Sequence, residues 1–248
     1  MPDWLAAGGA GLSAGAALLL GSAIAWFISV PTRVVAVVMA FGAGVLISAL
    51  SFELVQEAVE QGGLVATASG FLGGALVYVG LNILLARRGA RHRKRSGNQQ
   101  PSAGESGGAA IALGALIDGI PESMVLGLSF LTGGGLSIPM LAAVFISNVP
   151  EGLSSTAGMK NAGRGPAYIF GIWGGISVLS GVAASAGYLL LDNAAPTSLA
   201  FVNALAAGAI LAMITDTMVP EAFEEASLYS GLIASLGFLA AFSLHSLG

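Results

Sequence analysis

Several oxygen-bearing side chains lie in the middle of long apolar stretches of this chain. Asp118 and Glu122 are four residues apart, so they share one face of a helix. Asn148 and Glu151 share a face of the following stretch, and Ser147 precedes Glu151 by four residues. Carboxylate and amide oxygens are typical ligands of divalent cations. We therefore expect these five residues to form a metal site at mid-depth on two adjacent helices.

A proline directly precedes each of the two glutamates. Pro121 and Pro150 lie near the middle of their stretches, where proline removes one helical hydrogen bond and frees the carbonyl group four residues earlier. In lipid such a carbonyl must be satisfied within the protein or must line a wet cavity. The freed carbonyls of Ile117 and Ile146 therefore add backbone oxygens to the expected cluster.

The charge of these carboxylates needs compensation, because an ionised residue at the centre of a bilayer costs about 2.5–3.5 kcal/mol. The chain has nine Lys and Arg residues, and all lie between the apolar stretches, with Arg33 at the edge of one. We therefore expect the acids to be protonated or to be neutralised by a cation that is not part of the protein.

Further acidic residues lie near the ends of other stretches. Glu57 lies near one end of the second stretch, and Glu221 lies near the end of the seventh. Two readings stay open for this pair, either cation-attracting mouths of a pathway or ordinary interfacial acids. Asp216 lies deeper in the seventh stretch, which favours a functional role for it.

The composition predicts the environment of the chain. Hydrophobic residues make up 55% of it and charged residues only 9%, whereas soluble domains are about 25% charged. A membrane protein is therefore expected, and a soluble enzyme is excluded. The absence of cysteine excludes disulfides, thiolate catalysis and cysteine-ligated zinc or iron–sulfur sites. The net charge of −4 is too small to predict a nucleic-acid partner.

Eight stretches are long enough to cross a bilayer as helices, which takes about 20 apolar residues. They cover residues 5–28, 33–57, 64–86, 109–131, 137–158, 166–190, 198–220 and 228–247. All nine basic residues then fall in loops on one side, which the positive-inside rule makes cytoplasmic. The sequence thus predicts a single all-α integral membrane domain over residues 1–248, in the cell membrane, with both termini outside the cytoplasm.

The longest gap between stretches is residues 87–108. Six of its first nine residues are Lys or Arg, and it continues with Ser, Gly, Gln and Asn. This composition predicts a disordered basic cytoplasmic loop between the third and fourth spans.

Two pairs of stretches resemble each other. The segment that starts at Gly44 is similar to the one that starts at Gly208, and the segment around Pro121 is similar to the one around Pro150. The members of each pair run in opposite directions across the membrane. Inverted repeats with a site near the midplane are typical of transporters.

These motifs resemble those of the ZIP family of divalent-metal transporters. Residues 118–123 and 147–152 are similar to the family's His-Asn-x-Pro-Glu-Gly motifs of spans four and five, and residues 56–58 and 220–222 are similar to the ends of spans two and seven. The resemblance implies eight spans, outside termini, uptake toward the cytoplasm, and a metal site that includes Glu122, Asn148 and Glu151. It is also compatible with two ions that share bridging carboxylates.

The chain departs from the family at both motif histidines, which are replaced by Asp118 and Ser147. Imidazole favours zinc, whereas carboxylate and carbonyl oxygens suit harder ions such as Mn²⁺. We therefore expect a weaker preference for zinc and relatively better handling of manganese or iron. The expected substrate is a divalent ion of zinc, manganese, iron or cadmium, with no organic cofactor. Replacing Asp118 by His is expected to shift selectivity toward zinc.

The expected function is thus divalent metal-ion transport rather than an enzyme activity, with the ion and the lipid bilayer as partners. Glycine-rich spans also permit a homodimer. Two alternatives stay open, a proton- or sodium-coupled cation antiporter that uses the same carboxylates, and a non-transporting membrane metal sensor. An intramembrane hydrolase would need a nucleophile and a base within the spans, and neither histidine lies at mid-depth.

Overall fold

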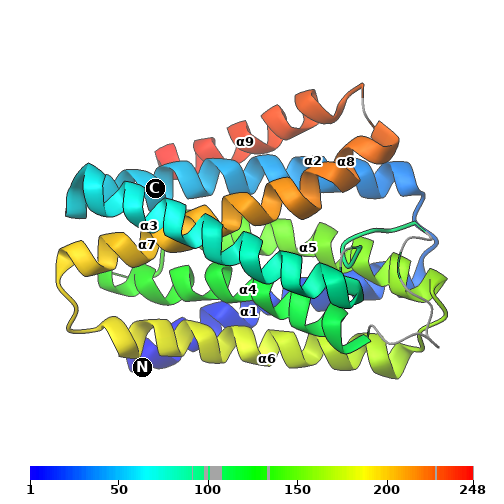
Figure 1. The fold of residues 1–248 in the computed structure, drawn as a ribbon, viewed down its shortest axis with the longest axis horizontal. Helices are drawn as coiled ribbons and strands as arrows, with labels where there is room; N and C mark the ends of the chain where they lie inside the picture. Colours follow the sequence, from blue (N-terminus) through cyan, green and yellow to red (C-terminus); the bar gives the residue numbers. More distant parts are fainter. Residues whose placement is uncertain (91, 98–99, 101–107, 133–134, 227, 248) are drawn as a thin grey trace.

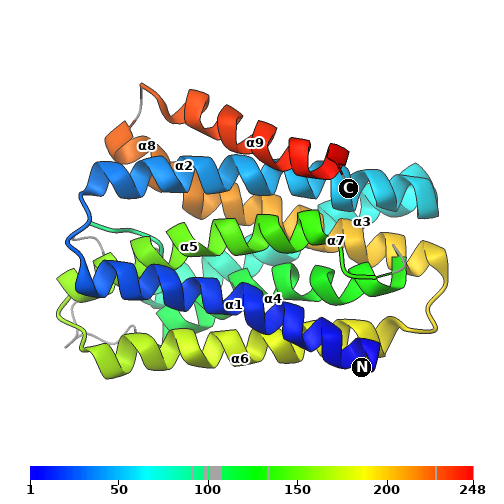
Figure 2. The same cartoon turned by 180° about the vertical axis from the view of Figure 1, so that it is seen from behind.

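A computed structural model describes residues 1–90, 92–97, 100, 108–132, 135–226 and 228–247. Every regular element in these ranges is a helix (Figures 1 and 2). The α-helices are α1 (Asp3–Phe27), α2 (Thr32–Ala49), α3 (Gln56–Leu85), α4 (Gly108–Thr132), α5 (Ile138–Asn161), α6 (Pro166–Leu191), α7 (Pro196–Met213), α8 (Val219–Ala226) and α9 (Ser230–Leu247). Three π-helices continue them, at Leu50–Val55, Ala86–Ala90 and Ile214–Met218.

Six helices of the described residues are long and apolar enough to cross a membrane. Large apolar side chains cover their outward faces, such as Leu76 on α3, Val182 on α6 and Leu236 on α9. Apolar surface of this extent marks contact with lipid rather than with water. The chain is therefore an all-helical, multi-pass membrane protein, as its composition predicts.

The prediction of eight spans differs from this count at two places. Thr32–Arg88 counts as one helix of 57 residues, although Gly63, at φ 74°, breaks its helical path. The helix α5 is not among the six, and its polar residues include Asn148 and Glu151. The number of spans therefore stays a prediction. Both termini lie at one end of the molecule (Figure 1), which we call the terminal end.

Several helix ends coincide with the breaks that the sequence predicts. Pro166 and Pro196 begin α6 and α7, where the fixed φ of proline suits the first helical turn. Ser137 caps α5, because its hydroxyl accepts a hydrogen bond of 3.1 Å from the backbone N–H of Met140. Local turn chemistry therefore sets where α5, α6 and α7 begin, and of these α5 carries Glu151.

The helices form two packing groups. In one, α1 packs against α5 and α6, and α4 packs against α6. In the other, α3 packs against α7, and α2 packs against α8 and α9. The groups meet where α2 contacts α5 and where α4 contacts α7, and the main apolar core includes Met39, Val144 and Ile210. The carboxylates of α4 and α5 therefore belong to one group and face the other.

The repeat between the segments at Gly44 and Gly208 has a structural counterpart. Each segment leads into a π-helix at an equivalent position, Leu50–Val55 in one and Ile214–Met218 in the other. A Cβ atom at Gly44 would lie 1.9 Å from the carbonyl oxygen of Ala234 in α9. At Gly208 it would lie 1.9 Å from that of Phe71 in α3. The pairs α2–α9 and α7–α3 therefore pack through equivalent glycines.

Candidate cation site

Asp118 lies on α4 and is only 2% exposed. Arg93 donates to both of its carboxylate oxygens, from Nε to Oδ2 at 2.9 Å and from Nη2 to Oδ1 at 2.8 Å. The Tyr78 hydroxyl donates a further hydrogen bond of 2.7 Å to Oδ1. A bidentate guanidinium–carboxylate pair of this kind is among the strongest side-chain contacts in proteins. Asp118 is therefore an ionised, fully partnered carboxylate.

Lys94 joins α4 to α5 through its ammonium group. Its Nζ lies 2.6 Å from Oε2 of Glu151 and 3.3 Å from Oδ2 of Asp118, and its side chain is 3% exposed. Burial by itself lowers the pKa of Lys94. The charges of Asp118 and then Glu151 together raise it by more than burial lowers it, so the pKa of Lys94 lies above its ordinary value. Lys94 is therefore a charged group at neutral pH, held between two carboxylates.

Glu122 completes the group from the next turn of α4. Its side chain is buried and interacts electrostatically with Glu151 and Lys94. The Oε1 atoms of Glu122 and Glu151 are both buried without a hydrogen-bond partner. Buried polar atoms are nearly always satisfied, so each exception calls for an explanation. Here two open acceptors lie in a site that already holds a cation.

The sequence-based expectation that the protein supplies no cation to these acids is wrong. Arg93 and Lys94 come from the region predicted as a solvated loop, and both are buried against Asp118. The physical reason is that an unpaired buried charge is costly, so the carboxylates hold basic side chains that local hydropathy assigns to water. We call residues 93–96 the basic segment.

The basic segment also binds acidic residues of α8. The backbone N–H and the hydroxyl of Ser96 donate to Oε1 of Glu221, at 3.0 and 2.5 Å. Arg95 Nη1 lies 2.7 Å from Oε2 of Glu224 and 3.5 Å from Oε2 of Glu221. The Ser154 hydroxyl also donates to Glu221, at 3.1 Å. Glu221 is thus buried beneath this segment rather than open to solvent.

The predicted disordered loop of residues 87–108 is only partly described. Ala86–Ala90 continue α3 as a π-helix, and the basic segment lies in the protein interior. Residues 91, 98–99 and 101–107 lie outside the described residues.

Other predicted site residues lie apart from the carboxylates or reach them indirectly. Asn148 donates from Nδ2 to the carbonyl of Ala14 in α1 at 2.9 Å, and Ser147 donates to its own helix. Asp216 is exposed and accepts a 2.8 Å hydrogen bond from Asn82. The Asn82 side-chain oxygen accepts one from Arg93, also at 2.8 Å. Asp216 is therefore linked to the site through Asn82 and then Arg93.

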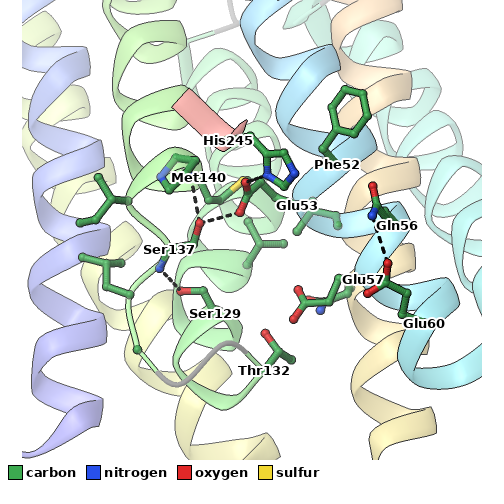
Figure 3. Close-up of a pocket in the computed structure, with 17 residues that line it drawn as sticks. Phe52, Glu53, Gln56, Glu57, Glu60, Ser129, Thr132, Ser137, Met140 and His245 are labelled. Atoms are coloured by element: carbon green, nitrogen blue, oxygen red, sulfur yellow. Dashed lines mark hydrogen bonds and ion pairs between the residues drawn. The ribbon is translucent and has the colours of Figure 1, made fainter. Parts of the chain in front are cut away.

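Glu57 lies in a separate cavity toward the terminal end, with a volume of about 500 Å³ (Figure 3). Its acidic residues are Glu53, Glu57 and Glu60, and we call it the acidic cavity. Glu53 contacts Nδ1 of His245 and accepts a 2.7 Å hydrogen bond from Ser137 (Figure 3). Glu57, for which the sequence leaves open a pathway mouth or an ordinary interfacial acid, therefore lines an acidic cavity.

Apolar side chains separate the acidic cavity from the carboxylates. Val125 and Met140 line the cavity and are each 1% exposed. Val125 follows Glu122 by three residues, which is about 4.5 Å along a helix. The carboxylates thus lie between this thin apolar layer and the basic segment.

Among the described residues, no group of three or more His, Asp or Glu side chains is close enough to hold a metal ion. Instead the Lys94 ammonium lies between Asp118 and Glu151, where a shared cation would contact both. Asp118 and Glu151 therefore bind a cationic side chain of their own chain.

Sequence reasoning missed Tyr78, Arg93, Lys94 and Ser96 as members of this site. The one signal for them was the run of basic residues beside a set of spans rich in uncompensated acids. That signal indicates attraction between them, but not which basic residue meets which acid.

The comparisons with known proteins agree in part with this picture. No family model matches the chain. The chain is 26% identical over 219 residues to an Arabidopsis thaliana protein named "Putative zinc transporter". The match covers 87% of this chain and 34% of the relative, so the chain spans about a third of the length of that protein.

Proposed function

We propose that the chain is a divalent metal-ion transporter of the zinc, manganese and iron class rather than an enzyme. The observation that carries this proposal is the Lys94 ammonium, bound between Asp118 and Glu151 in the interior of a multi-pass membrane protein. Carboxylates that bind an ammonium in this setting also suit a divalent metal ion. The name of the Arabidopsis relative gives independent support for a metal ion as substrate.

In this proposal the ligands of the ion include the carboxylate oxygens that the basic segment leaves unsatisfied. Glu122 and Glu151 each offer a buried Oε1 atom without a partner, and Asp118 lies on the same face of α4 as Glu122. Glu57 in the acidic cavity and Glu221 beyond the site would attract the ion at the two ends of the pathway. Asn148 and Ser147 would join as ligands only after a rearrangement of α5, because their hydrogen bonds lie elsewhere.

We further propose eight membrane crossings, with the terminal end outside the cytoplasm and uptake toward the cytoplasm. The break at Gly63 supports two crossings within Thr32–Arg88, and α5 is 24 residues long, enough to cross a bilayer. Basic residues in the connections at 28–33, 86–97 and 160–165, opposite the terminal end, support the orientation. The acidic cavity would then face the outside.

Transport also requires the site to open to either side in turn. The carboxylates lie on α4 and α5, whose packing group also contains α1 and α6. Movement of this group against α2, α3, α7 and α9 would change the side of the membrane to which the carboxylates are open. The absence of imidazole from the site favours harder ions, so we propose better transport of Mn²⁺ or Fe²⁺ relative to Zn²⁺ than a histidine-bearing site would give.

Metal flux into proteoliposomes tests the proposed function. We expect saturable flux of at least one ion among Zn²⁺, Mn²⁺, Fe²⁺ and Cd²⁺, and its loss in a Glu122→Gln/Glu151→Gln variant. An Asp3→Asn/Asp192→Asn variant is the matched control, since it removes two exposed carboxylates far from the site. Absence of flux of every ion from folded, reconstituted protein would refute the proposal.

A second candidate is a proton-coupled cation antiporter. The buried Lys94–Glu151 pair favours it, because a divalent cation bound to Glu151 would repel the adjacent ammonium. Lys94 could then lose one proton and remain as the neutral amine, so that one proton leaves for each cation that binds. A pH-sensitive dye inside the same liposomes separates the two. Proton release that accompanies cation entry and vanishes in Lys94→Gln would favour the antiporter.

A further inference from the structure

The basic segment occupies the groups to which the proposed function assigns the ion. Arg93 binds both oxygens of Asp118, and Lys94 binds Asp118 and Glu151. We propose that this segment is a tethered competitor of the substrate cation, so that the ion binds only when Lys94 leaves, and Lys94 thereby sets affinity and selectivity. The inference rests on the proposed function and deepens it.

Polar contacts hold the segment in place. Residues 92–97 read His-Arg-Lys-Arg-Ser-Gly and include no aliphatic or aromatic hydrocarbon side chain, so the hydrophobic effect does little to fix them. The backbone carbonyl of Lys94 accepts from the Ser154 hydroxyl at 2.9 Å, and that of Ser96 accepts from Asn161 at 3.0 Å. Gln100 donates to the backbone carbonyls of Arg93 and Arg95, at 3.1 Å each. The ion pairs of Arg93 and Lys94 with Asp118 and Glu151 add to these hydrogen bonds. A bound metal ion would neutralise the charge on which these ion pairs depend.

A divalent ion would satisfy acceptors that the segment leaves open. Lys94 contacts Oε2 of Glu151, while Oε1 of Glu151 and Oε1 of Glu122 are buried without hydrogen-bond partners. A metal ion brings twice the charge of the ammonium and takes six or more oxygen ligands in the case of hard ions. The ion and Lys94 cannot share the same carboxylate oxygens, because their charges repel at such short range.

The position of the segment makes the competition directional. Ser96 and Arg95 cover Glu221, which lies beyond the carboxylates on the side away from the acidic cavity. An ion that displaces Lys94 therefore also loosens the cover over Glu221 and opens its own onward path. Ions that bind carboxylates weakly, such as Na⁺ and K⁺, would leave the segment in place. Competition thus discriminates divalent from monovalent cations.

The first test is the affinity of the purified full chain for Mn²⁺, with Lys94→Gln against the parent protein. If Lys94 competes with the ion, the apparent affinity for Mn²⁺ is reduced in proportion to the fraction of protein in which Lys94 has left the carboxylates. Lys94→Gln removes the competitor and should therefore bind Mn²⁺ at least tenfold more tightly. An Arg87→Gln/Arg88→Gln variant is the matched control, because both residues are exposed at the end of α3 and should leave affinity unchanged. Equal or weaker binding by Lys94→Gln would overturn the proposal, since Lys94 would then support the site.

The second test measures the accessibility of the segment itself. Because the chain contains no cysteine, an introduced thiol is the single site of cysteine labelling. Ser96→Cys places one thiol at a buried position, and Arg88→Cys places one at an exposed position as the control. We expect the rate of maleimide labelling of Ser96→Cys to be slow without Mn²⁺ and to rise at least tenfold with saturating Mn²⁺. In the Lys94→Gln/Ser96→Cys variant labelling should be fast even without Mn²⁺. K⁺ at the same ionic strength should give no rise.

The outcomes separate this inference from the proposed function. Measured Mn²⁺ binding and flux with no change in Ser96→Cys labelling would overturn the competition and leave the transporter intact. Absence of both binding and flux in the parent protein and in Lys94→Gln would overturn the proposed function and this inference with it.

Discussion

At the scale of residues, the site is a balance between buried acids and buried bases. Asp118 and Glu151 form ion pairs with Arg93 and Lys94, and Glu122 is buried beside them. The gain from each ion pair must offset the cost of removing both charges from water. This balance explains why the bidentate Arg93–Asp118 pair also recruits the hydroxyl of Tyr78.

Loss of one partner from the buried pair should therefore be costly. We expect Asp118→Asn to lower the free energy of unfolding in detergent by about 3–5 kcal/mol, because it removes the charged carboxylate that pairs with the buried Arg93 guanidinium. Arg95→Gln is the control, since its side chain is 20% exposed and its pairs should contribute less than about 1 kcal/mol. Equal losses in the two variants would contradict the assignment of Arg93 to a buried pair.

The Arg93–Asp118 pair also affects the expected result of an Asp118→His substitution. Histidine at this position would supply imidazole for zinc, but it would also lose the bidentate contact with Arg93. We still expect the ratio of Zn²⁺ to Mn²⁺ flux to rise in this variant, because imidazole is the better zinc ligand. An unchanged ratio in folded protein would contradict the argument from ligand chemistry.

At the scale of elements, glycines let the helices of the repeat approach each other. A side chain at Gly208 would meet the carbonyl oxygen of Phe71, and one at Gly44 would meet that of Ala234. The hydrophobic effect does not drive helices together in lipid, so van der Waals contacts between closely packed helices stabilise their association instead. The π-helices Leu50–Val55 and Ile214–Met218 then bend the chain at equivalent places in both halves.

Gly208→Ala should accordingly loosen the contact between α7 and α3. The expected cost is about 1–3 kcal/mol in the free energy of unfolding, because the added Cβ would lie 1.9 Å from a backbone atom that cannot rotate away. Gly175→Ala on α6 is the matched control, since a Cβ added there would meet no atom of another residue within 4 Å. A stable Gly208→Ala protein with unaltered packing would show that the glycine contact is dispensable.

The helices were largely predictable from the sequence, and the contacts of the site were not. Apolar length and the prolines at 166 and 196 mark α6 and α7 with boundaries close to those observed. The positions of Asp118 and Glu122 on one face follow from helix geometry alone. Lys94 and Ser96 could not be placed, because their position depends on long-range pairing with Glu151 and Glu221 rather than on a local pattern.

At the scale of the whole molecule, two packing groups enclose the carboxylates between an acidic cavity and a basic segment. The groups meet through α2 with α5 and α4 with α7, so a shift between them changes the surroundings of the site without unfolding a helix. Acidic and basic residues also lie on opposite sides of the carboxylates. Glu53, Glu57 and Glu60 line the cavity toward the terminal end, and the basic segment lies on the other side. This division suits a pathway that attracts cations from one side.

The proposed orientation gives a direct expectation for single-cysteine variants in intact cells. Ser246→Cys lies near the terminal end and should react with a membrane-impermeant maleimide from outside. Arg88→Cys lies at the opposite end and should react only after permeabilisation. The reverse pattern would place the acidic cavity in the cytoplasm and would reverse the proposed direction of uptake.

The central claim is that the carboxylates around Lys94 bind the substrate cation, and anomalous X-ray scattering from crystals grown with Cd²⁺ tests it most directly. We predict an anomalous peak between Glu122 and Glu151, with the Lys94 ammonium displaced from its position 2.6 Å from Glu151. A Glu122→Gln/Glu151→Gln crystal should lack that peak. Lys94 in place at saturating Cd²⁺, with cadmium bound only elsewhere in a protein that transports it, would contradict the account.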